Sequence, residues 1–245
     1  MLEGGRMLLF RLIISILLWW GVVAGCYGDP VPSSQRSRSV ISQVKPGLAA
    51  ELSQDGFAWG APVFMRIFKK EKKLELWLGD HRGFRLFKSY TICTYGGQGL
   101  GPKTVQGDGK APEGFYYVAP RQLNPYSDYY LAFNLGYPNA YDRVHRRTGS
   151  ALMVHGYCVS IGCFAMTNKQ MSEIYTLADA ALRNGQTFFR VHIFPFRMTK
   201  SNMKKNASSP WIVFWRNLKR GYDMFEERHS PPNVVVRDRS YCFEP

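Results

Sequence analysis

The stretch from Val154 to Thr167 (VHGYCVSIGCFAMT) constrains this 245-residue chain more than any other segment. It places His155, Cys158 and Cys163 close together, with a glycine beside His155 and another beside Cys163. A cysteine is a nucleophile only as the thiolate, and an imidazole is a suitable base near neutral pH. Glycine lets the backbone turn sharply and approach a substrate closely. The stretch therefore predicts an acyl-transfer site in which His155 activates the thiol of Cys163.

Two other interpretations of the same residues stay open. His155, Cys158 and Cys163 could bind zinc, but a structural site needs a fourth ligand, and the chain has no CxxC pair. His192 or Cys242 could supply that ligand only if the fold happened to bring one of them close. Alternatively, Cys163 is a small buried hydrophobe, as free cysteines usually are. We favour the acyl-transfer interpretation and therefore predict neither a metal nor another cofactor.

The composition indicates a folded protein with an anionic partner. Hydrophobic residues make up 45% of the chain and aromatic residues 15%, which is enough for a core. The length allows one sizeable domain with an extension. A net charge of +14 favours anionic partners. The basic residues are scattered and form no nucleic-acid motif, so we expect no nucleic-acid partner.

The N-terminus carries a targeting signal. The apolar run from Leu12 to Ala24 is too short to span a bilayer comfortably, but it suits a signal-peptide core. It ends in VAGC, which resembles a bacterial lipobox and implies cleavage before Cys26 and lipidation of its thiol. Tyr27, in place of an aspartate, implies retention at the outer membrane. We therefore expect a lipoprotein-type signal peptide over residues 1–25, with an incidental cysteine or an uncleaved anchor as the alternatives.

The cysteine count limits the disulfides. The chain has five cysteines. If Cys26 is acylated and Cys163 stays free as the nucleophile, Cys93, Cys158 and Cys242 remain. An oxidising compartment then permits at most one bridge. The sequence does not choose among the pairs.

The remaining pattern predicts an α+β fold dominated by strands. Residues 26–47 are rich in Ser, Pro and Arg and are expected to form a flexible tether. Residues 48–200 are expected to form the catalytic domain. Alternating apolar residues or short apolar runs predict its strands at 62–68, 74–78, 84–93, 116–119, 130–135, 151–154 and 187–194. The glycine-rich residues 96–114 are a loop without the P-loop pattern.

Two helices follow the cysteine motif. Thr167 or Asn168 can cap the first, and Gly185 ends it. The second begins near Pro210 and carries an aromatic stripe that predicts core packing. A last short strand is expected at 233–237. We expect residues 201–245 to be a helical C-terminal extension packed on the catalytic domain.

Three longer motifs carry a family resemblance. They are FNLGYPNAYDR (133–143), HGYCVSIGCFAMT (155–167) and HIFPFRMT (192–199). Through them, residues 60–200 resemble the L,D-transpeptidase catalytic (YkuD-type) family, and most closely its YafK-like murein L,D-transpeptidase branch. The resemblance implies the mixed-sheet fold of that family.

The family places its base in a His-Gly pair and its nucleophile in an S-H-G-C-x-R motif. His155 and Gly156 match the pair, and Ser160, Gly162 and Cys163 match the nucleophile motif.

The chain departs from the general pattern at two positions inside this motif. Ile161 replaces the histidine of the motif, and Ala165 replaces its arginine. The arginine recognises a carboxylate in the family, and Arg197 and Arg143 are the candidates to replace it as substrate-binding residues.

The resemblance implies a reaction on peptidoglycan stem peptides. Cys163 would attack the carbonyl at the L-centre of meso-diaminopimelate and form a thioacyl intermediate, with His155 as base. The carbonyl of Gly156 would orient the imidazole, and the N–H groups of Gly162 and Cys163 would bind the oxyanion, with Ser160 beside them.

The implied intermediate has two fates. Transfer to an amine crosslinks the wall or attaches a wall-linked protein acceptor, whereas transfer to water makes the enzyme an L,D-carboxypeptidase or an amidase that releases a wall-bound lipoprotein. A non-catalytic peptidoglycan-binding module is the contrasting class. In each case we expect the protein in the periplasm of a Gram-negative bacterium, held at the outer membrane by its lipid.

Overall fold

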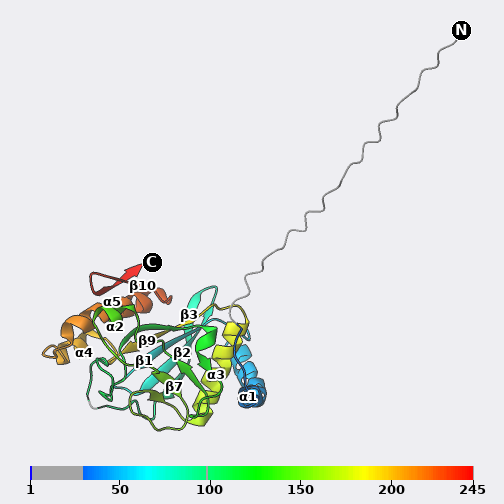
Figure 1. Cartoon of the computed structure of the whole chain (residues 1–245), viewed down its shortest axis with the longest axis horizontal. Coiled ribbons are helices and arrows are strands. Elements are labelled where there is room, and N and C mark those ends of the chain that lie inside the picture. The colour runs from blue at the N-terminus through cyan, green and yellow to red at the C-terminus, as the bar shows by residue number, and fades with distance from the viewer. Residues whose placement is uncertain (2–29, 98, 245) are drawn as a thin grey trace.

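A five-stranded mixed sheet forms the centre of the computed structural model, which describes Met1, residues 30–97 and residues 99–244 (Figure 1). Its strand order is β3-β2-β1-β9-β4. The strands are β1 (Val63–Phe68), β2 (Lys73–Asp80), β3 (Gly83–Thr91), β4 (Gly114–Val118) and β9 (Phe189–Phe194). Strands β1 and β9 are parallel, and the other neighbours are antiparallel.

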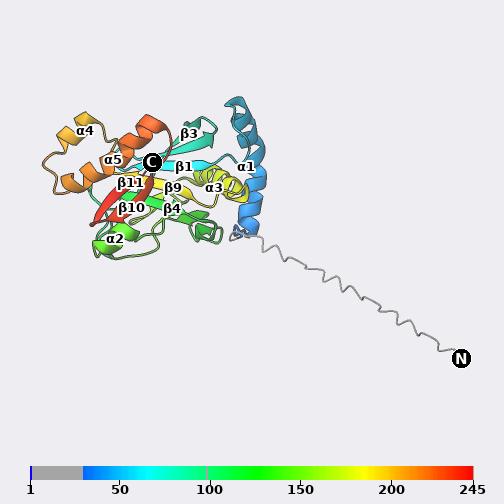
Figure 2. The same cartoon turned by 90° about the horizontal axis from the view of Figure 1, so that it is seen from above.

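Helices cover the two faces of this sheet. Val63, Met65 and Ile67 of β1 belong to the core shared with α1 (Gln35–Gln54) and α3 (Asn168–Arg183). Phe64 and Phe68 alternate with them and pack with aromatic residues of α5 (Ile212–Arg228). Figure 2 shows α1 and α3 at one side of the sheet and α5 at the other. Strand β1 is buried on both faces, which is why it is apolar at almost every position.

A second, four-stranded sheet carries the cysteine motif. Its order is β5-β6-β7-β8, and β7 and β8 are parallel. The strands are β5 (Leu123–Asn124), β6 (Ala132–Asn134), β7 (Met153–His155) and β8 (Phe164–Ala165). The short helices η1 (Pro120–Gln122) and α2 (Ala140–Val144) lie in the connections. Phe133, Val154 and Phe164 are fully buried and join this sheet to the main core.

The C-terminal extension packs on the aromatic face of the main sheet. It contains α5 together with α4 (Lys200–Lys205) and a hairpin of β10 (Asn233–Arg237) and β11 (Ser240–Glu244). Phe214, Trp215, Leu218, Tyr222 and Phe225 of α5 are buried, which confirms that the predicted aromatic stripe is core. The strand at 233–237 was predicted, but its partner β11 was not.

The predicted tether over residues 26–47 is wrong from residue 35 onward, because α1 begins there. Ser34 caps the helix in a capping box, so a serine that favours loops instead starts a helix. Leu48 and Leu52 are buried against the core. A few apolar residues are therefore enough to hold this segment as a helix when they lie on one face and pack against α3.

The predicted signal peptide over residues 1–25, apart from Met1, and the predicted lipidation site Cys26 lie outside the described residues. Of the helices in the described part of the chain, none is sufficiently long and apolar to cross a membrane.

A buried ion pair ties the glycine-rich loop to the main sheet. Lys69 follows β1, and its Nζ lies 3.0 Å from Oε1 of Glu113. Lys69 also donates to the carbonyls of Gly101 and Ala111 at 2.7 and 3.0 Å. Oε2 of Glu113 accepts from the indole of Trp215 at 2.8 Å. Because both charges are buried, each depends on these partners for the solvation that water would otherwise supply.

We expect the substitution Lys69→Met to lower the free energy of unfolding by about 3–5 kcal/mol, because it leaves the Glu113 carboxylate buried without its cation. Urea denaturation of the full chain measures the change. The double variant Lys69→Met/Glu113→Gln removes both charges and should recover part of the loss. An equal loss in the two variants would contradict this account.

Candidate active site

The pairing of β7 with β8 places His155 and Cys163 on the same face of the small sheet. Val154 lies opposite Phe164 and His155 opposite Ala165, in parallel register. Cys163 directly precedes β8, and the Met153 amide donates to its Sγ at 3.3 Å, so the thiol lies beside the first residue of β7. Side chains alternate along strands, and a two-residue offset across neighbouring strands separates the Cα atoms of His155 and Cys163 by about 8 Å. Their side chains therefore face the same space.

The hydrogen bond of the imidazole sets its tautomer. Nδ1 of His155 lies 2.7 Å from the carbonyl oxygen of Gly156. A carbonyl can only accept, so Nδ1 carries the proton and Nε2 is the ring's acceptor. The ring of Tyr129 lies 4.8 Å from the imidazole, centroid to centroid. The ring is thus held with its basic nitrogen available.

Gly156 is required by space as well as by its carbonyl. A Cβ at this position would lie 2.6 Å from Oδ1 of Asn168 and 2.9 Å from Cβ of Tyr130. The same Asn168 oxygen accepts from the Tyr157 amide at 2.9 Å. The start of α3 therefore packs directly against the His-Gly pair.

The thiol is half-buried and free. Besides accepting from Met153, its Sγ lies 3.6 Å from the carbonyl oxygen of Ala151, to which it donates. The amide of Cys163 donates to Oγ of Ser160 at 2.8 Å. In this structure that predicted oxyanion donor is therefore engaged, and Ser160 is the hydrogen-bond partner that shapes residues 160–163, which we call the cysteine loop. Ile161, at the position of the family's histidine, is 89% exposed.

Burial keeps both groups neutral. It lowers the pKa of His155, a shift that the Gly156 hydrogen bond opposes. Burial also raises the pKa of Cys163, although the Met153 amide, Ser160 and the charge of Lys103 pull in the other direction. Near neutral pH the pair is therefore a thiol and a neutral imidazole, and proton transfer must accompany nucleophilic attack.

Alkylation of Cys163 by iodoacetamide should accordingly reach half its maximal rate at a higher pH than alkylation of an ordinary thiol does. Mass spectrometry of the labelled peptide across pH 5–10 measures this. Cys163→Ala removes the signal, and Cys242, which is also free and half-buried, serves as the internal comparison. Rapid alkylation already at pH 6 would indicate a preformed thiolate–imidazolium pair and contradict the prediction.

The structure decides the disulfide that the sequence left open. Cys93 and Cys158 are bonded, with an S–S distance of 1.97 Å. The bridge links the segment after His155 to the segment after β3, and the amides of both cysteines donate to carbonyls at β8, those of Ala165 and Met166. The zinc interpretation loses a ligand, because the Cys158 sulfur is in the bridge. His192 also lies elsewhere, buried in β9 between the rings of Phe64 and Phe115.

Removing this disulfide should destabilise the protein. The bonded residues are 65 positions apart, and the chain-entropy estimate for such a loop is about 4 kcal/mol. Cys93→Ser/Cys158→Ser should therefore unfold at clearly lower urea concentration than the parent chain. Cys242→Ser is the matched control and should not shift the midpoint. An unchanged midpoint in the double variant would mean that the bridge contributes nothing to stability.

Glycines from the 96–114 loop support the cysteine loop. Gly96 has φ +69°, and a Cβ there would lie 2.1 Å from the backbone nitrogen of Gly162. A Cβ at Gly97 would lie 2.4 Å from the carbonyl oxygen of Gly109. The glycines allow three backbone segments to meet, and the Lys69–Glu113 pair holds the far end of the loop. Gly162 itself has φ +116°, which favours glycine.

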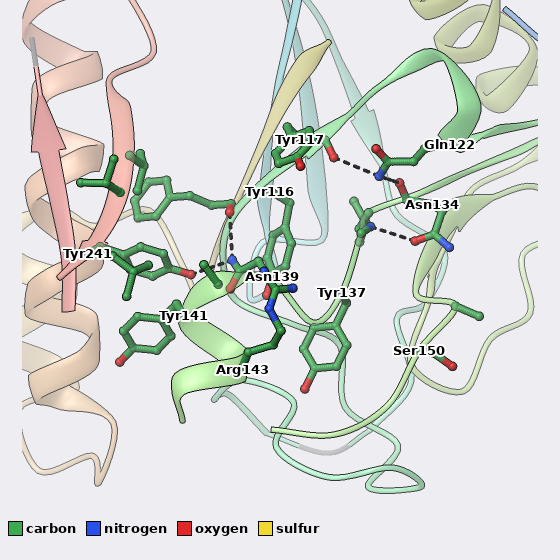
Figure 3. Close-up of a pocket in the computed structure, with 18 of the residues that line it drawn as sticks. Tyr116, Tyr117, Gln122, Asn134, Tyr137, Asn139, Tyr141, Arg143, Ser150 and Tyr241 are labelled. Carbon is green, nitrogen blue, oxygen red and sulfur yellow. Dashed lines mark hydrogen bonds between the residues drawn. The ribbon is translucent and has the colours of Figure 1, made fainter. Parts of the chain in front are cut away.

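Two neighbouring cavities lie near the thiol, and Cys163 lines the smaller one. One of about 200 Å³ includes Cys163, Ile161, Lys103, Ser150 and Ala151 in its lining. The other, of about 590 Å³, shares Ser150 and Ala151 with the first and is drawn in Figure 3. Lys103, Ser150 and Ala151 belong to no sequence motif, so the sequence alone does not predict them as site residues.

The structure separates the two predicted arginines. Arg143 lines the larger cavity. Arg197 does not line either of these cavities; its guanidinium lies 2.6 Å from Glu75 and stacks over Phe68, and its amide donates to Glu71. The candidate site therefore brings together His155, Gly156, Ser160, Gly162 and Cys163, with Arg143 in the adjoining cavity but without Arg197.

Comparisons with known proteins show which family the chain belongs to. Residues 64–193 match the YkuD family, described as the L,D-transpeptidase catalytic domain. The chain is 51% identical over 182 residues, 74% of each chain, to the Escherichia coli (strain K12) protein named "Putative L,D-transpeptidase YafK". The helical cell shape determining protein Pgp2 from Campylobacter jejuni aligns with 20% identity and a TM-score of 0.44, over 77% of this chain and 80% of that one.

The site and the mixed sheets are those of a cysteine- and histidine-bearing α+β domain. The chain belongs to the L,D-transpeptidase catalytic domain family, which confirms the resemblance and the predicted fold class.

Proposed function

We propose that this chain is a peptidoglycan enzyme of the L,D-transpeptidase type that acts through a thioester on Cys163. The shared face of His155 and Cys163, with Nε2 of His155 unprotonated, is the observation that carries the proposal. Membership of the family supports the class of substrate, which is the stem peptide of peptidoglycan.

In the proposed reaction, Sγ of Cys163 attacks the carbonyl at the L-centre of meso-diaminopimelate. Nε2 of His155 takes the thiol proton and returns it to the leaving amine as the amide bond breaks. An incoming amine or water then attacks the thioester, gives its proton to Nε2 and restores the thiol. The imidazole thus serves as base and acid in turn, which fits a resting pair without charge.

Backbone N–H groups near the sulfur would stabilise the oxyanion. Gly162 offers one such group, and Met153 offers another because its amide already points at Sγ. The amide of Cys163 would join them only by leaving Ser160. Each oxyanion donor is typically worth roughly 3–4 kcal/mol in the transition state.

The N-terminal sequence supports a proposal for where in the cell this reaction takes place. A lipobox-like VAGC before residue 27 is the basis for proposing a lipid anchor at Cys26. Such an anchor would hold the enzyme at the outer membrane, on the periplasmic side where the wall lies. Intact mass of the mature protein tests it, because a chain that begins at an unmodified Cys26 would exclude lipidation.

Purified muropeptides with the wild-type protein test the function directly. We expect conversion of the substrate, and we expect His155→Ala to reduce kcat by about 10²- to 10⁴-fold because the base is lost. Cys163→Ala should abolish conversion, whereas Cys242→Ala, a change at the other free thiol, should not.

The products decide the fate of the intermediate. Crosslinked dimers mean transfer to an amine, and shortened or released stems mean hydrolysis. A carbapenem should leave a covalent adduct on Cys163, seen by mass spectrometry. If no adduct and no product formed, the remaining function would be that of a non-catalytic wall-binding module.

A further inference from the structure

The larger cavity adjoins the small cavity that Cys163 lines. Ser150 and Ala151 line both this cavity and the smaller one that contains Cys163, and the carbonyl of Ala151 accepts from Sγ. A ligand in the larger cavity therefore reaches the thiol by extending into the smaller cavity past Ser150 and Ala151. Its volume of about 590 Å³ is typical of a ligand site. We call this space the side groove.

The C-terminal hairpin builds one wall of the side groove. Val234, Val235 and Val236 of β10 and Tyr241 of β11 line it, opposite residues of β4 and η1. These hairpin residues lie beyond residues 64–193, the part of the chain that matches the family domain. The groove therefore has a wall that the common catalytic domain does not provide.

The charges of the side groove favour an anion. Arg143 is exposed and lines it, whereas none of the described residues that line it is aspartate or glutamate. The nearby Asp142 is buried behind the wall, where Arg147 and the Tyr116 hydroxyl bind its two oxygens at 2.8 Å. Because Asp142 is paired in this way, its negative charge does not make the side groove less favourable for an anion.

The groove offers side chains rather than an open strand edge. The outward carbonyls of Phe115 and Tyr117 on β4 accept from the amides of Asn139 and Gln122. Figure 3 shows these two amides in place along the strand. A ligand is thus held by arginine and by aromatic faces, not by addition of a strand.

We propose that the side groove selects a peptide that carries free carboxylates and presents it to Cys163, with Arg143 as a carboxylate-binding residue and the β10–β11 hairpin as the opposing wall. The proposal rests on the proposed function for the identity of the peptide. Arg143 lies on α2, where the Pro138 carbonyl accepts from its guanidinium at 2.5 Å and orients it. Its remaining N–H groups can form a charge-assisted pair with a carboxylate.

Binding to the Cys163→Ala protein tests the groove without the chemistry. The probes are a stem tetrapeptide with free carboxylates and the same peptide with every carboxylate amidated, and the readout is Kd by calorimetry. Arg143→Gln should raise Kd for the free-carboxylate peptide about tenfold or more and leave Kd for the amidated peptide nearly unchanged. Val235→Asp places a negative charge on the hairpin wall, where it would repel the carboxylates of the peptide. It should therefore raise Kd for the free-carboxylate peptide more than Kd for the amidated peptide.

Two surface changes on α5 are the matched controls. Arg216→Gln removes an exposed cation, and Val213→Asp adds a carboxylate at a 74% exposed valine; neither should alter Kd. Equal effects of Arg143→Gln on the two peptides, or no effect on either, would overturn the proposal. Binding that depends on Arg143 with no turnover by the wild-type protein would refute the proposed function alone. Turnover that ignores Arg143 would refute the groove alone.

Discussion

The parallel pairing of β7 with β8 is the constraint on which the candidate site depends. It brings a residue at the end of one strand and a residue just before the other onto a single face, with a two-residue offset. The opposite faces of both strands are fully buried through Val154 and Phe164, so a slip of one residue would drive the reactive groups into the core. Burial of the apolar face thus secures the register, and the register secures the chemistry.

Supports far away in the sequence converge on this pair of strands. The bridge between Cys93 and Cys158 closes one side, and the glycine-rich loop closes another through backbone contacts with Gly162. That loop is held in turn by the buried Lys69–Glu113 pair, whose carboxylate also binds α5 through Trp215. The C-terminal extension is therefore joined to the cysteine loop through a chain of contacts as well as through the groove wall.

The candidate catalytic pair is uncharged, whereas the side groove next to it is lined by positive charge. Desolvation leaves His155 and Cys163 uncharged, while the side groove next to the small cavity at Cys163 is lined by Arg143, without a carboxylate among its described residues. A high overall positive charge is a weak guide to such an arrangement. Most of the cations are elsewhere, and Arg197 is used in an ion pair with Glu75.

Features that depend on residues a few positions apart could be predicted from the sequence. They are the His-Gly pair, the cysteine loop, the capped helix α3 and the aromatic stripe of α5. The serine-rich start of α1 predicts a flexible tether, but these residues form a helix because its apolar face is buried against α3. The disulfide partner, the role of each arginine and the hairpin wall were decided only by tertiary structure. Each of these depends on which distant segments meet, and that follows from packing of the whole core rather than from any local pattern.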